Sequence, residues 1–287
     1  MLPTFLGLGA AKAGTTWLHE LLASHPHVWM PRGRKEVHFF DRHYEEGFDW
    51  YERFFPTGEE AERYRAAGEI TPGYLDDPRC PERIAEAPSV RQLLVSLRDP
   101  VERLHSAYGH HVRNRNYRRS FEDFIEEHPR EVERSCYARH LKRYLRHFER
   151  EKLLVLRFER LFDDVPATQR ALADFLGLDA ALFPEDAGRS AVNKTYVPRF
   201  QRAFALAQKG LRWLRRREWT GALRFIHRSG LGAVAKRVMG RREDGVPPAS
   251  PETRRRLRHR YADDIEALGA LVGKDFSAWN APEGSEG

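Results

Sequence analysis

Cysteine is scarce in this chain, which carries only Cys80 and Cys136 among 287 residues. Two cysteines do not make a disulfide framework, and they fit a reducing compartment in which one or both are buried as small apolar residues. No apolar run approaches the roughly 18 residues that a membrane-spanning helix needs. The N-terminal residues have no basic stretch and no small-residue cleavage site of a secretory signal. We therefore expect a cytoplasmic protein.

Metal-ligand spacing and internal repeats are also missing. The 13 histidines are scattered, and no H-E-x-x-H motif or paired Cys/His spacing occurs, so we expect no metal site. The composition, with 41% hydrophobic and 32% charged residues, is that of a globular protein. The length suits one sizeable α/β domain. We expect a single domain over 1–287, with a core at 1–198, a basic helical subregion at 199–272 and a tail at 273–287.

Charge is distributed unevenly along the chain. The formal net charge is +7, but residues 199–260 alone contain 18 Lys or Arg against 4 Asp or Glu, a net of +14. Such a segment can attract a phosphorylated cofactor, a polyanionic acceptor, nucleic acid or an anionic membrane, or it can be a solvated helix face. No nucleic-acid-binding motif accompanies the charge, so we expect no nucleic-acid partner. The sequence does not indicate an oligomeric state.

Short apolar runs alternate with helical patterns in the first two thirds of the chain. We expect buried strands at Thr4–Leu8, Gln92–Leu97 and Leu153–Phe158. Helices are expected over these ranges: Thr15–Ala23, Pro100–Val112, Ser135–Phe148, Pro166–Leu176 and Pro251–Val272. This alternation predicts an α/β fold of P-loop-like, three-layer type, in which helices flank a central parallel sheet.

The first strand leads into a loop of small residues and then a helix. A helix N-terminus presents free N–H groups and a positive dipole end, and small residues let the backbone approach an anion closely. The segment therefore predicts a phosphate site built from these residues: Ala10, Ala11, Lys12, Ala13, Gly14, Thr15, Thr16 and Trp17. Gly9 and Gly14 have the spacing of an ATP-binding P-loop, but Thr15 stands where that motif has its lysine. A nucleotide kinase remains the first alternative function, and a non-enzymatic polyanion-binding module is the second.

A second phosphate contact is expected after the strand at Gln92–Leu97. Arg98 follows this strand directly, at the end of a parallel sheet where ligands bind, and Ser106 comes two turns later. Together they could hold a phosphate through a guanidinium fork and a hydroxyl. The alternative for Arg98 is a surface ion pair with Glu102.

With these segments the sequence resembles the sulfotransferases that use 3′-phosphoadenosine 5′-phosphosulfate (PAPS). Within that family it is most similar to the branch of the heparan sulfate N- and 3-O-sulfotransferases and their bacterial relatives. The resemblance rests on four segments in register and on a similar C-terminal Phe276–Trp279. The four segments are Lys12–Thr16, Lys35–Asp41, Arg98–Pro100 followed by Arg103, Ser106 and Tyr108, and Ser135–Leu145. The resemblance implies that 10–17 bind the 5′-phosphosulfate, that Arg98 and Ser106 bind the 3′-phosphate of PAPS, and that no metal is needed.

The resemblance also supplies candidates for the rest of the site. A late basic loop closes on the nucleotide in the family, and our candidates for it are Lys194, Arg241 and Arg242. Candidate acceptor-binding residues are Lys35, His38, Asp41, Tyr74 and Tyr137. The acceptor itself, whether a carbohydrate, a lipid or another natural product, is left open, as is N- rather than O-sulfation.

Glu36, His38 and Asp41 are the candidates for proton transfer. A hydroxyl acceptor must lose its proton as sulfur is attacked, and a positioned carboxylate contributes roughly 10²- to 10⁴-fold to such a step. We expect an extended stretch from Glu36 to Asp41, in which Glu36 and His38 would point to the same side. We expect Glu36 to be the general base, His38 its orienting partner or substitute base, and Lys12 the cation that stabilises the leaving group. The family commonly has a lysine at the position of Ile70, so another cation could be required here.

Overall fold

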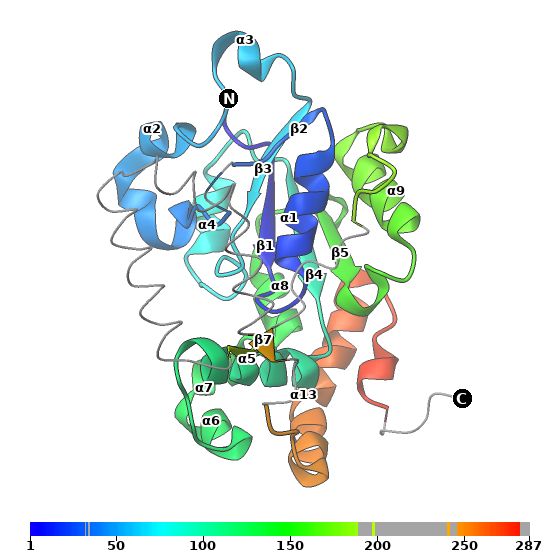
Figure 1. Ribbon diagram of the computed structural model, residues 1–287. Helices are drawn as coiled ribbons and strands as arrows, with labels where there is room; N and C mark the ends of the chain where they lie inside the picture. The colour runs from blue at the N-terminus through cyan, green and yellow to red at the C-terminus, as the bar shows by residue number, and fades with distance from the viewer. Residues whose placement is uncertain (32, 34, 189–196, 199–239, 242–245, 282–287) are drawn as a thin grey trace. The chain divides into compact units, whose positions relative to one another are not determined.

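The computed structural model describes residues 1–31, 33, 35–188, 197–198, 240–241 and 246–281 (Figure 1). The chain divides into two compact units. The first unit comprises 1–107, 122–192 and 249–287, and the second comprises 108–121 and 193–248. In the second unit, the described strands β6 (Val197–Pro198) and β7 (Gly240–Arg241) form an antiparallel pair. The candidate base and the β1–α1 loop both belong to the first unit.

A five-stranded sheet forms the centre of the first unit, with strand order β2-β3-β1-β4-β5. Every neighbouring pair in it is parallel. The strands are β1 (Phe5–Gly9), β2 (Val28–Trp29), β3 (Ala66–Ile70), β4 (Gln92–Leu97) and β5 (Leu153–Arg157). The three expected strands are β1, β4 and β5, and the predicted class, a parallel sheet flanked by helices, is confirmed.

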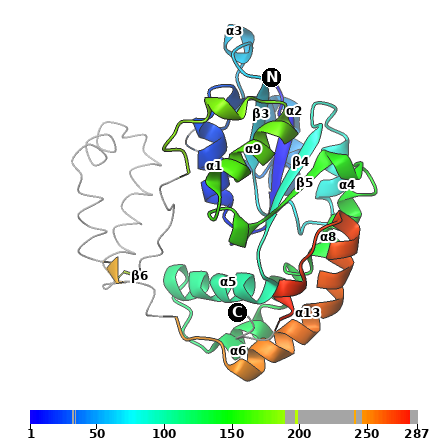
Figure 2. The ribbon, with the colours of Figure 1, turned by 90° about the vertical axis from the view of Figure 1, so that its right-hand side faces the viewer.

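Helices cover both faces of this sheet. α1 (Thr15–Ser24) and α9 (Val165–Leu176) lie on one face, and α4 (Cys80–Ala85) and α8 (Tyr137–Tyr144) lie on the other (Figure 2). The C-terminal helix α13 (Pro251–Val272) packs on α8. The other helices are α2 (Gly47–Glu52), α3 (Gly58–Ala61), α5 (Pro100–Asn114), α6 (Phe121–Glu127) and α7 (Pro129–Glu133). Large apolar side chains of α1, α9 and the strands form a continuous core between sheet and helices.

The helix boundaries follow from local capping. Asp164 accepts a hydrogen bond from the N–H of Ala167 and so caps α9, which ends at Gly177 with the left-handed backbone that glycine tolerates (φ 69°). Ser250 caps α13 in the same way, through the N–H of Thr253. The helix expected at Ser135–Phe148 is shorter than predicted. Its first turn begins at Tyr137, because the Asp264 carboxylate accepts hydrogen bonds from the N–H groups of Ala138 and Arg139.

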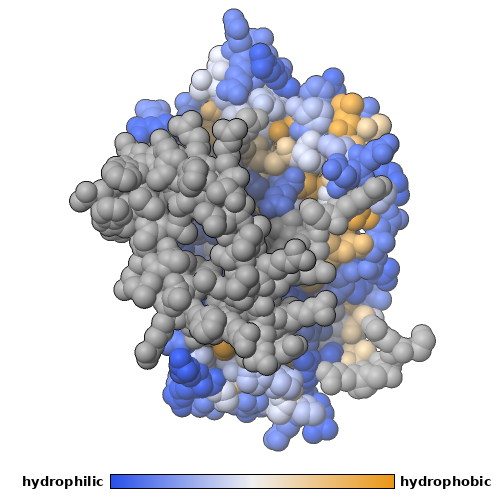
Figure 3. All heavy atoms as spheres, in the orientation of Figure 1, coloured by the Kyte–Doolittle hydropathy of each residue, from blue (hydrophilic) through white to orange (hydrophobic). Residues whose placement is uncertain are grey.

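The described surface is mainly hydrophilic, with scattered small hydrophobic patches on the face seen in Figure 3. Among the described residues, Phe162 and Leu182 are the large hydrophobic side chains that are exposed. No helix within the described ranges is long and apolar enough to cross a membrane. No group of His, Cys, Asp or Glu in the same ranges could hold a metal ion.

Candidate active site

The loop between β1 and α1 lies at the topological switch point of the sheet. β1 pairs with β3 on one side and with β4 on the other, so the connections of β1 and β4 leave in opposite directions. In open parallel sheets this arrangement opens a crevice at the carboxyl ends of the two strands, where ligands bind. Residues 10–14 leave β1 at this point and Arg98 leaves β4. The sheet therefore brings together the two predicted phosphate contacts.

The β1–α1 loop has the backbone of an anion cradle. Lys12 and Gly14 both have positive φ angles, of 72° and 78°. Left-handed residues that alternate with a right-handed one turn successive N–H groups toward one side, and the N-terminus of α1 adds its own free N–H groups. A side chain at Gly14 would lie 3.0 Å from Phe158 Cδ2, so that position requires glycine for space as well as for φ. These features suit a phosphate or sulfate oxygen.

Lys35 extends to the start of α1. Its Nζ lies 2.8 Å from Thr16 Oγ1, 3.4 Å from Thr15 Oγ1 and 3.3 Å from Glu36 Oε1. Lys35 is a predicted acceptor-binding residue, and its ammonium group contacts the hydroxyls of the predicted phosphate site. The side chain is 26% exposed, so its charge lies partly out of water. The loop and the candidate base are therefore joined by one cation.

Charges alternate along the segment that carries the candidate base. His38 Nε2 lies 3.3 Å from Glu36 Oε2, and His38 Nδ1 lies 2.9 Å from Asp41 Oδ2. The hydrogen bonds to Asp41 and Glu36 raise the pKa of His38 to about 9. The hydrogen bond from His38, with Lys35 adding to it, lowers the pKa of Glu36. At neutral pH Glu36 is therefore ionised and His38 is protonated.

The expectation of an extended stretch from Glu36 to Asp41 is wrong beyond His38. His38 has a left-handed backbone (φ 60°), and residues Phe39–His43 form a single π-helical turn. This turn places the Asp41 carboxylate beside the ring of His38, three residues earlier. The close contact of Glu36 with His38 agrees with the expectation that both point to one side.

Glu69 on β3 anchors the segment 35–41 from behind. Its carboxylate accepts hydrogen bonds from Thr71 Oγ1 (2.7 Å) and Tyr74 Oη (2.6 Å), and also from the N–H of Val37. Thr71 Oγ1 in turn accepts the N–H of His38 at 3.3 Å, and Tyr74 Oη accepts the N–H of Phe39 at 2.8 Å. Three consecutive main-chain N–H groups therefore bond to Glu69 or to its immediate donors.

The Glu69 side chain is fully buried, and burial changes the pKa of its carboxyl group. Burial raises the pKa of the Glu69 carboxyl to about 7, although the hydrogen bonds from Tyr74, Thr71 and Tyr51 oppose that shift. A buried carboxylate with several donors fixes its partners more rigidly than a surface group does. Buried hydrogen bonds therefore anchor the backbone on both sides of His38.

Arg98 directly follows β4, and Ser106 lies within α5. The Arg98 guanidinium lies 4.7 Å from the centre of the Phe158 ring and 3.9 Å from Glu102 Oε2. The expected alternative, an ion pair with Glu102, is thus present as a long contact. Arg103, which belongs to the same motif, is fully buried and bonds to Ser135 and Glu131, so it joins α5 to the α7–α8 region.

Three predicted binding residues have buried side chains. Trp17 is 2% exposed and its Nε1 donates to the carbonyl of Gly188. Tyr74 and Tyr137 are 0% exposed; the hydroxyl of Tyr137 donates to the carbonyl of Arg98 at 2.8 Å. These side chains support the crevice from within the core. Lys194 and Arg242 lie outside the described residues, and Arg241 lies on β7 of the second unit.

A comparison with sequence models of protein families shows the family to which the chain belongs. The sequence model described as "Sulfotransferase domain" matches residues 3–199, more than half of the chain. The chain belongs to the sulfotransferase family. The suspected resemblance is thereby confirmed.

Individual relatives agree with this membership. The mouse heparan sulfate glucosamine 3-O-sulfotransferase 3A1 is 34% identical over 186 residues, which cover 62% of this chain and 46% of that protein. The human bifunctional heparan sulfate N-deacetylase/N-sulfotransferase 3 is 30% identical over 196 residues, covering 62% of this chain and 22% of that protein. The chain therefore spans at most about half the length of these two relatives.

A solved structure also covers this sulfotransferase-family chain from end to end. The crystal structure of a sulfotransferase from Alicyclobacillus acidocaldarius aligns with 98% of this chain and 100% of its own, with 25% identity and a TM-score of 0.69. The similarity includes the parallel sheet with helices on both faces.

Sequence reasoning missed two parts of this family site. The reach of Lys35 back to Thr16 could not be read from spacing, because 19 residues separate the two groups. β3 was missed because its sequence, Ala-Ala-Gly-Glu-Ile, lacks a run of large apolar residues and carries Glu69. The available signal was the position of Ile70, next to Glu69, where the family commonly has a lysine.

Proposed function

We propose that this protein transfers the sulfuryl group of PAPS to an acceptor hydroxyl, with Glu36 as general base. The observation that carries the proposal is the contact of Lys35 with both the loop hydroxyls and Glu36. Lys35 Nζ lies 2.8 Å from Thr16 Oγ1 in the predicted phosphosulfate site and 3.3 Å from Oε1 of the predicted base Glu36. A kinase of the P-loop type lacks support, because Thr15 replaces the lysine that such enzymes place on the β- and γ-phosphates.

The donor side follows from the crevice at the switch point. Residues 10–16 offer N–H groups, two threonine hydroxyls and Lys12 to the 5′-phosphosulfate, and Arg98 with Ser106 is assigned to the 3′-phosphate. When bound, PAPS supplies a sulfuryl group attached to a phosphate that is a good leaving group. Lys12 and Lys35 hold positive charge at the loop, where the leaving phosphate oxygen gains negative charge. Lys35 is thus our candidate for the cation that Ile70 does not provide.

The acceptor side follows from the charge pattern of 35–41. The Glu36 carboxylate takes the proton of the acceptor hydroxyl as its oxygen forms a bond to sulfur, and the bond from sulfur to the bridging phosphate oxygen breaks. His38, protonated and held by Asp41, keeps the Glu36 carboxylate oriented and ionised. Its pKa is raised to about 9, so it is mostly protonated at neutral pH and we assign it to orientation. Asp41 completes this role by holding His38.

The relatives point to the class of acceptor without fixing it. Two of them are named for action on heparan sulfate, a glycan. A glycan or small-molecule hydroxyl is accordingly the proposed acceptor class, with no requirement for a metal.

Calorimetric titration of PAP, ADP and ATP, without and then with magnesium, tests the donor assignment. We expect PAP to bind without metal and ADP to bind at least tenfold more weakly, a difference of about 1.4 kcal/mol that represents the 3′-phosphate. Replacement of Arg98 by Met should remove most of that difference. Preferred binding of ATP with magnesium would instead support the kinase, and absence of all three interactions would support a polyanion-binding module.

A further inference from the structure

Two arginines hold the π-helical turn Phe39–His43, which carries Asp41. Arg83 on α4 donates from Nη1 to the carbonyl of Phe40 at 2.9 Å. Arg79, directly before α4, donates from Nη2 to the carbonyl of Asp41 at 2.8 Å. Carbonyl groups in the last turn of a helix have no donor within the helix, so they need donors from outside it. The two guanidinium groups supply such hydrogen bonds, and the assignments above use neither of them.

Both arginines are themselves fixed in place. Arg79 forms a fork on Asp77, with Nε 3.0 Å from one carboxylate oxygen and Nη2 2.7 Å from the other. The Arg83 guanidinium lies 4.5 Å from the centre of the Tyr44 ring, and its side chain is 20% exposed. It also contacts Glu45 at 3.4 Å, but that carboxylate is 90% exposed and so adds little. A planar guanidinium that is held in this way presents its remaining donors in a fixed direction.

The Asp41 carboxylate has little room beside His38. Asp41 is 8% exposed, and a side-chain carbon added at Gly73 would lie 3.0 Å from its Oδ2. The same oxygen lies 2.9 Å from Nδ1 of His38. Other charged groups that face His38 are Glu36 and Arg42, and Glu69 lies behind its main chain. Displacement of the turn would therefore change the contact between Asp41 and His38.

We propose that Arg79 and Arg83 are positioning residues, which hold the turn 39–43 so that the Asp41 carboxylate faces His38. The inference rests on the proposed function for its consequence, the orientation of Glu36 by His38. The direction of a change at His38 separates positioning from simple electrostatics. Loss of a nearby cation would by its charge alone raise the pKa of His38, whereas loss of the contact with Asp41 would lower it.

NMR titration of the histidine rings tests this role without an acceptor. His38 should titrate near pH 9 in the unmodified protein, and His38→Gln identifies its signal. In Arg83→Met the midpoint of His38 should fall toward 6.5 by at least about 1 pH unit. Arg79→Gln should change it in the same direction. Arg83→Lys keeps a cationic donor and should retain most of the original value.

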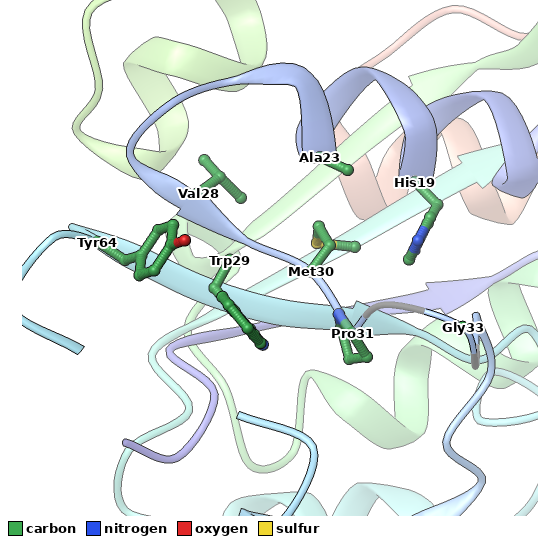
Figure 4. Close-up of a pocket in the computed structure, with 8 residues that line it drawn as sticks. All are labelled: His19, Ala23, Val28, Trp29, Met30, Pro31, Gly33 and Tyr64. Carbon is green, nitrogen blue, oxygen red and sulfur yellow. The ribbon is translucent and has the colours of Figure 1, made fainter. Parts of the chain in front are cut away.

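A matched control removes an arginine that bonds to carbonyls elsewhere. Arg150 donates to the carbonyls of Leu153 and Val272, both at 2.6 Å, beside the first residue of β5. Arg150→Met should leave the midpoint of His38 unchanged. His19, which lines a cavity with residues of α1 and β2 (Figure 4), is an internal reference. Burial, with Lys35 adding to it, lowers its pKa to about 4, so its ring should stay neutral from pH 6 to 10 in every variant.

The outcomes separate this inference from the proposed function. A midpoint of His38 that is unchanged or raised in both Arg83→Met and Arg79→Gln overturns the inference, as does an equal fall in Arg150→Met or a midpoint near 6.5 in the unmodified protein. If Arg83→Met does not fold, Arg79→Gln decides alone, because that side chain is 56% exposed. PAP affinity should be the same in all variants. Failure of PAP to bind the unmodified protein counts against the proposed function, and the titration still decides the role of the arginines.

Discussion

The β1–α1 loop and the segment 35–41 form two parts of one site, but different interactions hold them in place. The loop is defined locally: its glycines, its small residues and the start of α1 are all within nine positions of one another. The segment 35–41 is not self-supporting. Its N–H groups at 37, 38 and 39 bond to Glu69 on β3, or to Thr71 and Tyr74 just after β3.

This difference predicts that the loop acts mainly on donor binding and the segment 35–41 mainly on turnover. Changes in the loop should act first on donor binding, because the loop presents its N–H and hydroxyl groups to the phosphosulfate. Changes in 35–41 or in Glu69 and its donors should act on turnover and leave PAP affinity unaltered. Lys35 contacts both parts, so its substitution should change both PAP affinity and turnover.

Removal of the base should give the largest effect. Glu36→Gln keeps the shape and the hydrogen-bonding capacity of the side chain but cannot accept a proton, so kcat should fall by about 10²- to 10⁴-fold. The PAP dissociation constant, measured by calorimetry, should be unchanged. Glu59→Gln is the control, since that side chain is exposed on α3, outside both parts of the site. A fall of less than tenfold in Glu36→Gln would remove the base assignment.

Neutralisation of Lys35 should affect both parts of the site. Lys35→Met removes the hydrogen bonds to Thr16 and Glu36, and loss of such a fixed cation typically costs about 10²- to 10³-fold in kcat. PAP affinity should also fall, in contrast to Glu36→Gln. Lys152→Met, at an exposed position, provides the control. If only turnover changes, Lys35 belongs to the acceptor side, as its position in the sequence had suggested.

The same difference decides what could be predicted from sequence. β1, β4, β5, α1, α9 and α13 could be predicted because each depends on a local pattern of apolar residues, caps and turn residues. The loop at 10–14 could be predicted for the same reason. The network around Glu69 could not, because Tyr51 and Tyr74 reach it from separate elements. The π-helical turn at Phe39–His43 is likewise set by these long-range bonds and not by propensity.

Loss of one donor to Glu69 should give a smaller effect, mainly on stability. Tyr74→Phe removes the hydroxyl that donates to Glu69 and accepts the N–H of Phe39, which leaves buried polar groups unpaired. The free energy of unfolding should fall by about 1–3 kcal/mol for each group left unpaired, measured in urea. To show that the role is positional, kcat should fall severalfold while PAP affinity stays constant. Tyr44→Phe, which removes a surface hydrogen bond to Glu86, should change neither quantity appreciably; equal destabilisation by both substitutions would contradict the anchoring role.

The smallest expected effect is the change of stability and turnover with pH, which tests the charge on His38 between Glu36 and Asp41. Asp41 and Glu36 raise the pKa of His38 from 6.5 to about 9, so folded protein retains this proton where the unfolded chain has lost it. The stability that His38 contributes is therefore fully present below pH 6.5 and is lost as pH rises from 6.5 through 9. Turnover should stay level across neutral pH and decline near pH 9, when the orienting charge disappears. In His38→Gln both dependences should flatten. A rate that instead rises near pH 6.5 in the unmodified protein, and loses that rise in His38→Gln, would make neutral His38 the base and leave Glu36 as its partner.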